Sequence, residues 1–193
     1  MDDAALVKAF LEGDQRAFGE LFKRHQLTVY KLVRRYAKTH EDSRDLTQRA
    51  FLQAFEAARR ALPRLISTGE GVPFRAWLLR IAINLGKNHV RDAARWPSAK
   101  VELVDVQPAT GASAVEALER AQAEALTRKA VLTLPKRQRE VFTLRIDAAL
   151  PFAEVASALG ISEGNAKAHF HHAVKRLRDE VATMISGGTH DAL

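Results

Sequence analysis

The chain of 193 residues contains no cysteine, which removes several kinds of chemistry at once. Without cysteine it cannot form a disulfide, hold a metal through thiolates or use a thiol nucleophile. No run approaches the roughly 20 apolar residues of a membrane-spanning helix. The first residues include Asp2 and Asp3 and lack the pattern of a signal peptide. We therefore expect a cytoplasmic protein with no membrane insertion.

Signatures of catalysis are missing as well. The sequence has no Walker loop, no GxSxG motif and no HExxH motif, and its carboxylates are not paired for acid–base chemistry. His169, His171 and His172 cluster near the end, and the first and last of them share a helical face, so a metal pair is conceivable. No carboxylate lies one turn from both, which favours solvated or DNA-facing histidines. We expect no enzyme activity, no cofactor and no metal.

Basic charge is abundant and unevenly placed. The net charge is +7. Residues 1–95 carry +7, residues 96–127 carry −3 and residues 128–193 carry +3, counted from Lys, Arg, Asp and Glu. Basic proteins attract nucleic acid by neutralising phosphates and releasing counterions. Two basic blocks separated by an acidic stretch indicate two nucleic-acid-facing units joined by a linker that does not bind.

Hydrophobic periodicity predicts four helices in the first 95 residues. Gly13 ends the first, Asp14 is a suitable N-cap for the second, and the polar segment 39–43 is expected to be a turn. Pro63 is expected to stop the third helix, and segment 64–72 to be a flexible loop. Pro73 then stands where a fourth helix would start, covering residues 74–95.

The second half predicts a linker followed by another set of helices. Segment 97–113 is rich in Pro, Gly, Ala, Thr and Ser and has few large apolar residues, so it is expected to be an interdomain linker. Helical periodicity resumes near Ala114. The predicted fold is all-α, with two small helical domains at 1–96 and 114–186, a flexible linker at 97–113 and a tail at 187–193.

The strongest local motif begins at Phe152. A short helix with apolar positions meets a turn at Gly160, where glycine supplies a left-handed conformation, and Ser162 is a suitable N-cap for the last helix. This pattern predicts a helix-turn-helix whose second helix can enter a major groove. An ordinary helical hairpin is the alternative, and the basic residues that follow argue against it: Lys167, Lys175, Arg176 and Arg178.

The predicted fourth helix carries a second candidate surface. Asn84, Lys87, Asn88 and Arg91 recur at spacings of three and four, so they share one face. Amide and cationic groups on one face suit base edges and phosphates. A solvated helix face is an equally good interpretation of this pattern taken alone.

In their order, these motifs resemble the extracytoplasmic-function (ECF, group 4) sigma factors of bacterial RNA polymerase. The resemblance covers about residues 4–183 and excludes the tail. Besides the helix-turn-helix, it rests on three segments: Asp45-Leu46-Thr47-Gln48 with Phe51, Phe74-Arg75-Ala76-Trp77-Leu78 with Ile81-Ala82 and Asn84-Leu85, and Leu134-Pro135 with Arg139-Glu140-Val141-Phe142.

The resemblance implies a division of labour among named residues. Core-polymerase binding is expected from Asp45, Leu46, Gln48, Phe51 and Leu52. Recognition and melting of the −10 element is expected from Asn84, Lys87, Asn88 and Arg91, with Ser67, Thr68 and Gly69 in the loop that would hold a flipped base. Recognition of the −35 element is expected from Ser162, Asn165, Lys167, Ala168, His171, His172, Lys175 and Arg176.

The implied partners are core RNA polymerase, promoter DNA and an anti-sigma factor. Two other readings stay open at this point. A stand-alone helix-turn-helix regulator would bind duplex DNA without polymerase, usually as a dimer on a palindromic site. A nuclease would need a cluster of His and carboxylate ligands, which the sequence does not offer.

Overall fold

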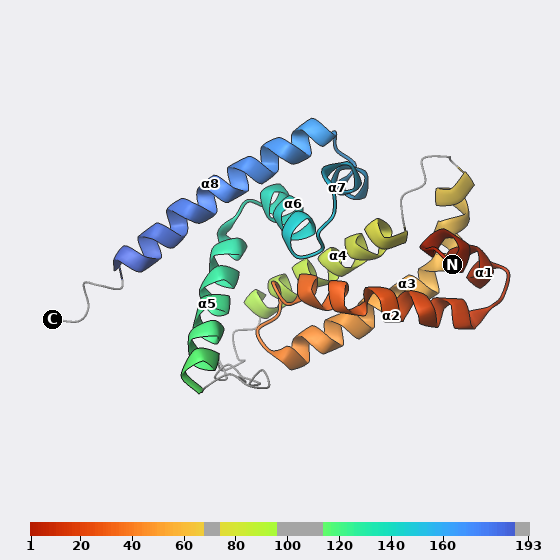
Figure 1. Ribbon diagram of the computed structural model, residues 1–193, viewed down its shortest axis with the longest axis horizontal. Coiled ribbons are helices and arrows are strands. Elements are labelled where there is room, and N and C mark those ends of the chain that lie inside the picture. Colours follow the sequence, from red (N-terminus) through yellow and green to blue (C-terminus); the bar gives the residue numbers. More distant parts are fainter. Residues whose placement is uncertain (68–73, 96–113, 188–193) are drawn as a thin grey trace.

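The protein is described from a computed structural model, which covers residues 1–67, 74–95 and 114–187. In these ranges all regular structure is helical, as the sequence predicts (Figure 1). The helices are α1 (Asp3–Leu11), α2 (Gln15–Val33), α3 (His40–Ser67), α4 (Phe74–Arg95), α5 (Ala114–Thr133), α6 (Lys136–Ile146), α7 (Phe152–Leu159) and α8 (Glu163–Gly187). The expected linker 97–113 and the end of the tail lie outside the described residues. No described helix is long and apolar enough to cross a membrane.

Helices α1 to α4 form a bundle around an aromatic core. Phe10, Phe18 and Phe55 lie with ring centroids 5.1–5.3 Å apart, and Phe74 extends this cluster from α4. Such tilted and edge-on ring pairs add to the stabilisation that burial provides. Side-chain caps define where α1 and α2 begin: Asp2 accepts the N–H of Ala5 at 2.8 Å and Asp14 that of Arg16 at 2.9 Å.

Helix α3 is longer at both ends than the sequence predicts. The segment expected to be a turn is a helix start: Thr39 Oγ1 accepts the N–H of Asp42, whose carboxylate accepts the N–H of Thr39. This reciprocal pair is a capping box. At the other end the helix continues through Pro63 to Ser67. Pro63 is exposed, so the carbonyl that loses its helical partner can be hydrated.

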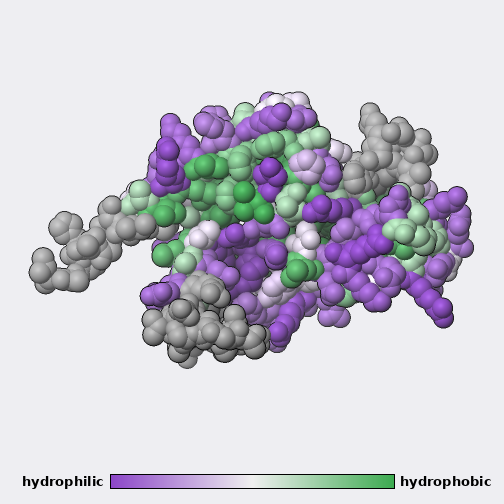
Figure 2. Space-filling model, in the orientation of Figure 1, coloured by the Kyte–Doolittle hydropathy of each residue, from purple (hydrophilic) through white to green (hydrophobic). Residues whose placement is uncertain are grey.

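Helices α5 to α8 form the second group. Phe170 of α8 packs against Phe142 of α6 and Phe152 of α7, at centroid distances of 6.1 and 5.5 Å. Apolar side chains also remain on the surface here, and Figure 2 shows a hydrophobic band between α8 and the helices below it. Large exposed hydrophobic residues on these helices include Leu126, Ile146, Val174 and Val181.

The two groups pack directly on each other. Helix α7 lies on α4, and buried residues of α6, α7 and α8 belong to the same apolar cluster as the core of the first bundle. Tyr36, which follows α2, is buried, and burial raises its pKa to about 12. The ring fits because Gly86 of α4 has no side chain: a Cβ there would lie 2.6 Å from Tyr36 Cγ. The domains predicted from the sequence therefore form one continuous body in this structure.

We predict that Gly86→Ala destabilises the fold. The added methyl meets the base of the Tyr36 ring, which has no free space, and overpacking of this kind costs about 1–3 kcal/mol. Gly19→Ala is the matched control, because Gly19 lies inside α2 and nothing is within 4 Å of its Cβ position. It should be neutral or stabilising by up to about 1 kcal/mol. Urea unfolding of both variants measures the difference, and equal effects would contradict the packing described.

Candidate nucleic-acid interface

The turn between α7 and α8 has the geometry of a helix-turn-helix. Gly160 adopts the left-handed conformation (φ 64°, ψ 43°), and the next N–H, that of Ile161, donates to the carbonyl of Ala156 at 3.0 Å. Ser162 Oγ accepts the N–H of Asn165 at 3.1 Å, which confirms the predicted N-cap. The turn thus satisfies backbone groups at the end of α7 and at the start of α8.

Helix α8 separates a packed face from an exposed one. Ala166 and Ala173 are fully buried, and their small size lets α8 lie close to α6 and α7. Lys167 is exposed and pairs with Glu163 at 2.7 Å. All eight residues expected to lie near the −35 element are exposed: Ser162, Asn165, Lys167, Ala168, His171, His172, Lys175 and Arg176. In the described part of the chain, no group of three or more His, Asp or Glu side chains could hold a metal.

The predicted −10 face of α4 is only partly open. Asn84, Asn88 and Arg91 are exposed, whereas the Lys87 side chain is 25% exposed and its ammonium lies 2.8 Å from Glu140 Oε1 of α6. Glu140 itself is buried and also accepts from Arg137 at 3.1 Å. The second group of helices therefore covers one of the four residues expected on this face.

A groove between α3 and α4 adds residues that the sequence did not single out for DNA. It measures about 870 Å³, and Trp77, Arg80 and Asn84 line one side while Arg60 lines the other. Arg80 is exposed and one turn before Asn84, so its spacing could have placed it on the same face. Ser67 belongs to α3, although its side chain is not described, and Thr68 and Gly69 lie outside the described residues.

The predicted core-polymerase residues divide between surface and core. Asp45, Gln48 and Leu52 are exposed on α3, and Leu52 is 57% exposed. Leu46 and Phe51 are buried, so they support this helix from inside and present no surface to a partner. Beside Gln48 lies a cavity of about 850 Å³ whose other wall includes the exposed apolar residues Phe22 and Leu27 of α2. The sequence analysis did not assign α2 to this face.

A second ion pair joins the two groups of helices at the end of α6. Arg35 donates to both oxygens of Asp147 through bonds of 2.8, 2.9 and 3.0 Å. The Asp147 side chain is only 7% exposed. Burial raises its pKa, and the Arg35 guanidinium opposes that rise. Arg75 of α4 also donates to the carbonyl of Ala148 nearby.

Two known family models match this chain, one in each group of helices. Residues 21–96 match the model described as Sigma-70 region 2, and residues 124–177 match Sigma-70, region 4. The chain is 30% identical over 175 residues to the ECF RNA polymerase sigma factor SigM of Mycobacterium tuberculosis. The aligned residues cover 91% of this chain and 82% of the relative.

Two solved structures share the architecture. CnrH, in complex with the cytosolic domain of CnrY, matches with a TM-score of 0.66 and 26% identity, over 94% of this chain and 97% of that one. The sigma factor RpoE of Bartonella quintana, in complex with the anti-sigma factor NepR, matches with a TM-score of 0.59 and 20% identity, over 86% of this chain and 96% of that one. The second likeness bears on the fold alone.

We predict that Arg35→Ala loosens the joint between the two groups of helices. Without Arg35, the buried Asp147 carboxylate loses its partner, which costs about 3–5 kcal/mol when it is ionised. The exposed pair between Arg49 and Asp45 is the control, because Arg49→Ala should cost under about 0.5 kcal/mol.

The effect of Arg35→Ala should depend on pH. A carboxyl whose folded pKa is raised stabilises the fold fully below its unfolded pKa, and this contribution is lost as pH rises through the folded pKa. Arg35→Ala raises the pKa of Asp147 further, so the stability gap to wild type should widen from about pH 4 upward. Urea unfolding at pH 4, 5 and 7 measures this gap, and a gap that does not change with pH would refute the prediction.

Proposed function

The chain belongs to the extracytoplasmic-function family of RNA polymerase sigma factors, and on that premise we propose how its residues share promoter recognition. As a sigma factor it binds core RNA polymerase, directs it to specific promoters and helps melt the −10 region to initiate transcription. The observation that carries this conclusion is the relation to SigM, which extends over 91% of the chain and includes both sigma regions. We assign residues 1–96 to core binding and the −10 element, and residues 114–186 to the −35 element.

Helix α8 reads the −35 duplex in this proposal. A major groove about 12 Å wide admits one α-helix, and the exposed start of α8 supplies short side chains that let the helix approach the bases. Ser162, Asn165 and Ala168 occupy this start. Lys167, Lys175 and Arg176 are exposed cations that neutralise phosphates and fix the register.

The groove between α3 and α4 meets the −10 element. Asn84 and Asn88 offer amide groups to base edges, and Arg60 and Arg80 place positive charge on both walls of the groove. The aromatic ring of Trp77 gives a surface on which an unstacked base can rest. We keep Ser67, Thr68 and Gly69 as the segment that receives a flipped base, because extrusion costs a few kcal/mol that a pocket must offset.

Lys87 can contact DNA only if the two groups of helices move relative to each other. In the structure its ammonium pairs with buried Glu140, and helix α6 covers it. Contact between Lys87 and a DNA phosphate requires that the pair separate. The form that binds a promoter therefore has α6 displaced from α4.

Core polymerase binds the exposed face of α3, through Asp45, Gln48 and Leu52. The neighbouring cavity adds the apolar side chains Phe22 and Leu27 of α2, so this face combines hydrogen-bonding groups with exposed hydrophobic surface. Protein interfaces commonly have this composition. Leu46 and Phe51 act from inside, by holding the helix in place.

An anti-sigma factor is a further proposed partner. The sigma factor RpoE, which shares the fold, is seen with the anti-sigma factor NepR. Leu126, Ile146 and Val174 are exposed apolar residues of the second group of helices, and we propose that a protein partner covers them. We place the protein in the cytoplasm, where polymerase acts, and assign it no catalytic activity of its own.

The stand-alone regulator is the second candidate function. It shares the helix-turn-helix, yet it leaves the match to sigma region 2 without a role. It also predicts a dimer on a palindromic site, bound without polymerase. Transcription with purified components separates the two functions.

We predict that the chain and core RNA polymerase together give discrete transcription starts from a promoter library, and that neither does so alone. Gln48→Ala should reduce transcript yield at limiting core enzyme, since it removes an exposed polar group from the proposed interface. Gln15→Ala is the matched control, because Gln15 is exposed at the start of α2 and none of the proposed contacts uses it. At saturating core enzyme, the transcript yield of Gln48→Ala should return to that of the wild type. No starts, alongside tight binding of duplex DNA by the chain alone, would establish the regulator instead.

We predict that Lys167→Ala weakens binding to −35 duplex DNA and lowers the slope of log affinity against log salt by about one. Loss of a phosphate contact releases one counterion fewer, so both changes should appear together. Lys8→Ala removes an exposed lysine from α1 and should leave the slope unchanged. Fluorescence anisotropy over a salt series measures the slope, and a wild-type slope would remove Lys167 from the phosphate contacts.

A further inference from the structure

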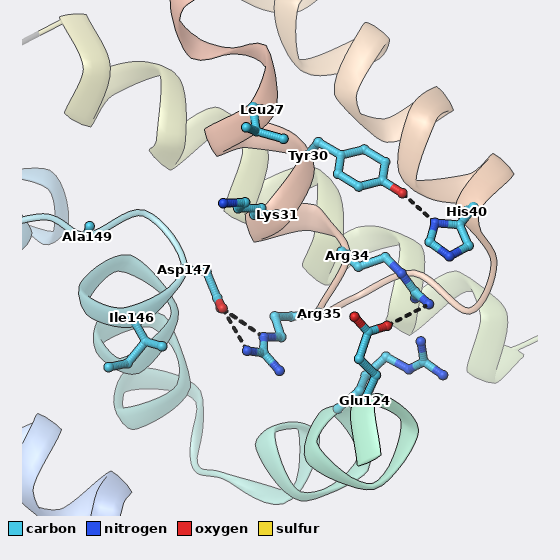
Figure 3. A pocket seen from close by; sticks show the side chains of 11 residues that line it. Leu27, Tyr30, Lys31, Arg34, Arg35, His40, Glu124, Ile146, Asp147 and Ala149 are labelled. Carbon is cyan, nitrogen blue, oxygen red and sulfur yellow. Dashed lines mark hydrogen bonds and ion pairs between the residues drawn. The ribbon is translucent and has the colours of Figure 1, made fainter. Parts of the chain in front are cut away.

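A cavity of about 550 Å³ lies between the two groups of helices, at the end of α2 (Figure 3). Arg34 and Arg35 enter it from α2, Glu124 from α5 and Asp147 from the end of α6. Its volume falls in the range of pockets that hold small molecules. Leu27, which we placed on the polymerase-binding face, also lines this cavity, but the charged side chains of the cavity have no part in the DNA and polymerase contacts proposed above.

The charges in this cavity do not balance. Counting the described lining residues, four side chains are cationic (Lys31, Arg34, Arg35 and Arg128) and two are carboxylates, which leaves two positive charges in excess. Both carboxylate oxygens of Asp147 already accept hydrogen bonds from Arg35. Glu124 is exposed and lies 3.7 Å from Arg34, too far for a strong bond, and it also faces Arg128.

Two further observations indicate that this group can accept an anion. The Arg34 side chain is 12% exposed, and its buried Nε has no hydrogen-bond partner among the described residues. A buried donor of this kind destabilises the fold until a partner satisfies it. Burial, together with the neighbouring guanidiniums of Arg34 and Arg35, lowers the pKa of Arg128. An anion in the cavity would accept from the Arg34 donor and would oppose this lowering of the Arg128 pKa.

We infer that this cavity binds a small phosphorylated molecule with two or more linked phosphate groups, held by Arg34, Arg128 and Lys31. Arginine matches phosphate oxygens with its planar array of donors. Two linked phosphates supply enough negative charge to offset the excess, and Tyr30 and Ile146 provide apolar wall for an organic part. The cavity is far smaller than a DNA duplex, which favours a free molecule over nucleic acid.

A ligand bound in this cavity would hold the two groups of helices together, because it would contact residues at the end of α2 and on α5. It would act on the same joint as the ion pairs of Arg35 and Lys87. A bound ligand would therefore oppose the separation that exposes Lys87. This regulatory consequence rests on the proposed function, whereas the binding itself does not.

Calorimetric titration of the full chain with sodium pyrophosphate tests the site, with sulfate at matched ionic strength as the comparison. We expect saturable binding of one pyrophosphate per chain. Arg128→Gln and Lys31→Gln should each weaken it roughly tenfold, as expected for loss of one charge-assisted contact. Arg178→Gln and Lys8→Gln remove the same charges from exposed positions elsewhere and should change nothing. No binding, or equal weakening in all four variants, would overturn the proposal.

Two additional measurements complete the test. Unfolding midpoints without ligand should match wild type for Lys31→Gln, an exposed position, which keeps the experiment informative if Arg128→Gln is unstable. A single-stranded oligodeoxythymidine should not compete with pyrophosphate. If the oligodeoxythymidine does compete with pyrophosphate, and this competition is lost in the Arg128→Gln variant, the site binds nucleic-acid phosphates and the proposal of a small ligand is refuted. Because no step uses polymerase, failure here is distinguishable from failure of the transcription experiment.

Discussion

Two carboxylates on one short helix connect the halves of this protein. Glu140 lies in the middle of α6 and Asp147 follows its last residue, and each is paired with a cation from the first bundle, Lys87 or Arg35. Both acids are almost fully enclosed, so neither can lose its partner cheaply while the halves stay together. If the halves separate, water takes the place of each partner, and that penalty disappears.

The same joint has an apolar part with different properties. Helix α7 rests on α4, and the buried ring of Tyr36, packed on Gly86 inside the first bundle, lies beside Thr143 and Glu140 of α6. Apolar burial stabilises contact without fixing which groups must meet, whereas the ion pairs require one alignment. The apolar contact thus stabilises the association of the two halves, and the ion pairs determine how α6 is aligned on the first bundle. A change at either pair should shift the alignment before it unfolds either half.

Local features of the chain were predictable, and long-range partners were not. The helix-turn-helix follows from Gly160 and Ser162, whose roles depend only on neighbouring backbone, and the structure confirms both. The start of α3 was mistaken for a turn because a capping box and a turn use the same polar residues. Glu140 and Asp147 pair across 53 and 112 residues, and no periodicity shows which helix an acid will meet.

The candidate site shows the same limit. Spacing placed Asn84, Asn88 and Arg91 on an exposed face, because a single helix fixes their directions. The same periodicity puts Leu46 and Phe51 on the apolar face of α3, where the structure buries them, although the family resemblance assigned both to contact with the polymerase. The contribution of Phe22 to the face beside Gln48 depends on how α2 packs against α3, which only the three-dimensional structure reveals.

The shared use of Lys87 has a consequence for which genes such a factor can serve. If Glu140 competes with DNA for one ammonium group, every promoter meets the same opening penalty, so the ranking of promoters by affinity does not change. The occupancy of promoters does change, because a uniform penalty raises every dissociation constant by the same factor. Weak promoters whose dissociation constant then exceeds the concentration of the sigma factor are left empty, while strong promoters remain occupied. Competition from Glu140 would therefore reduce the set of responding genes without altering any contact with a base.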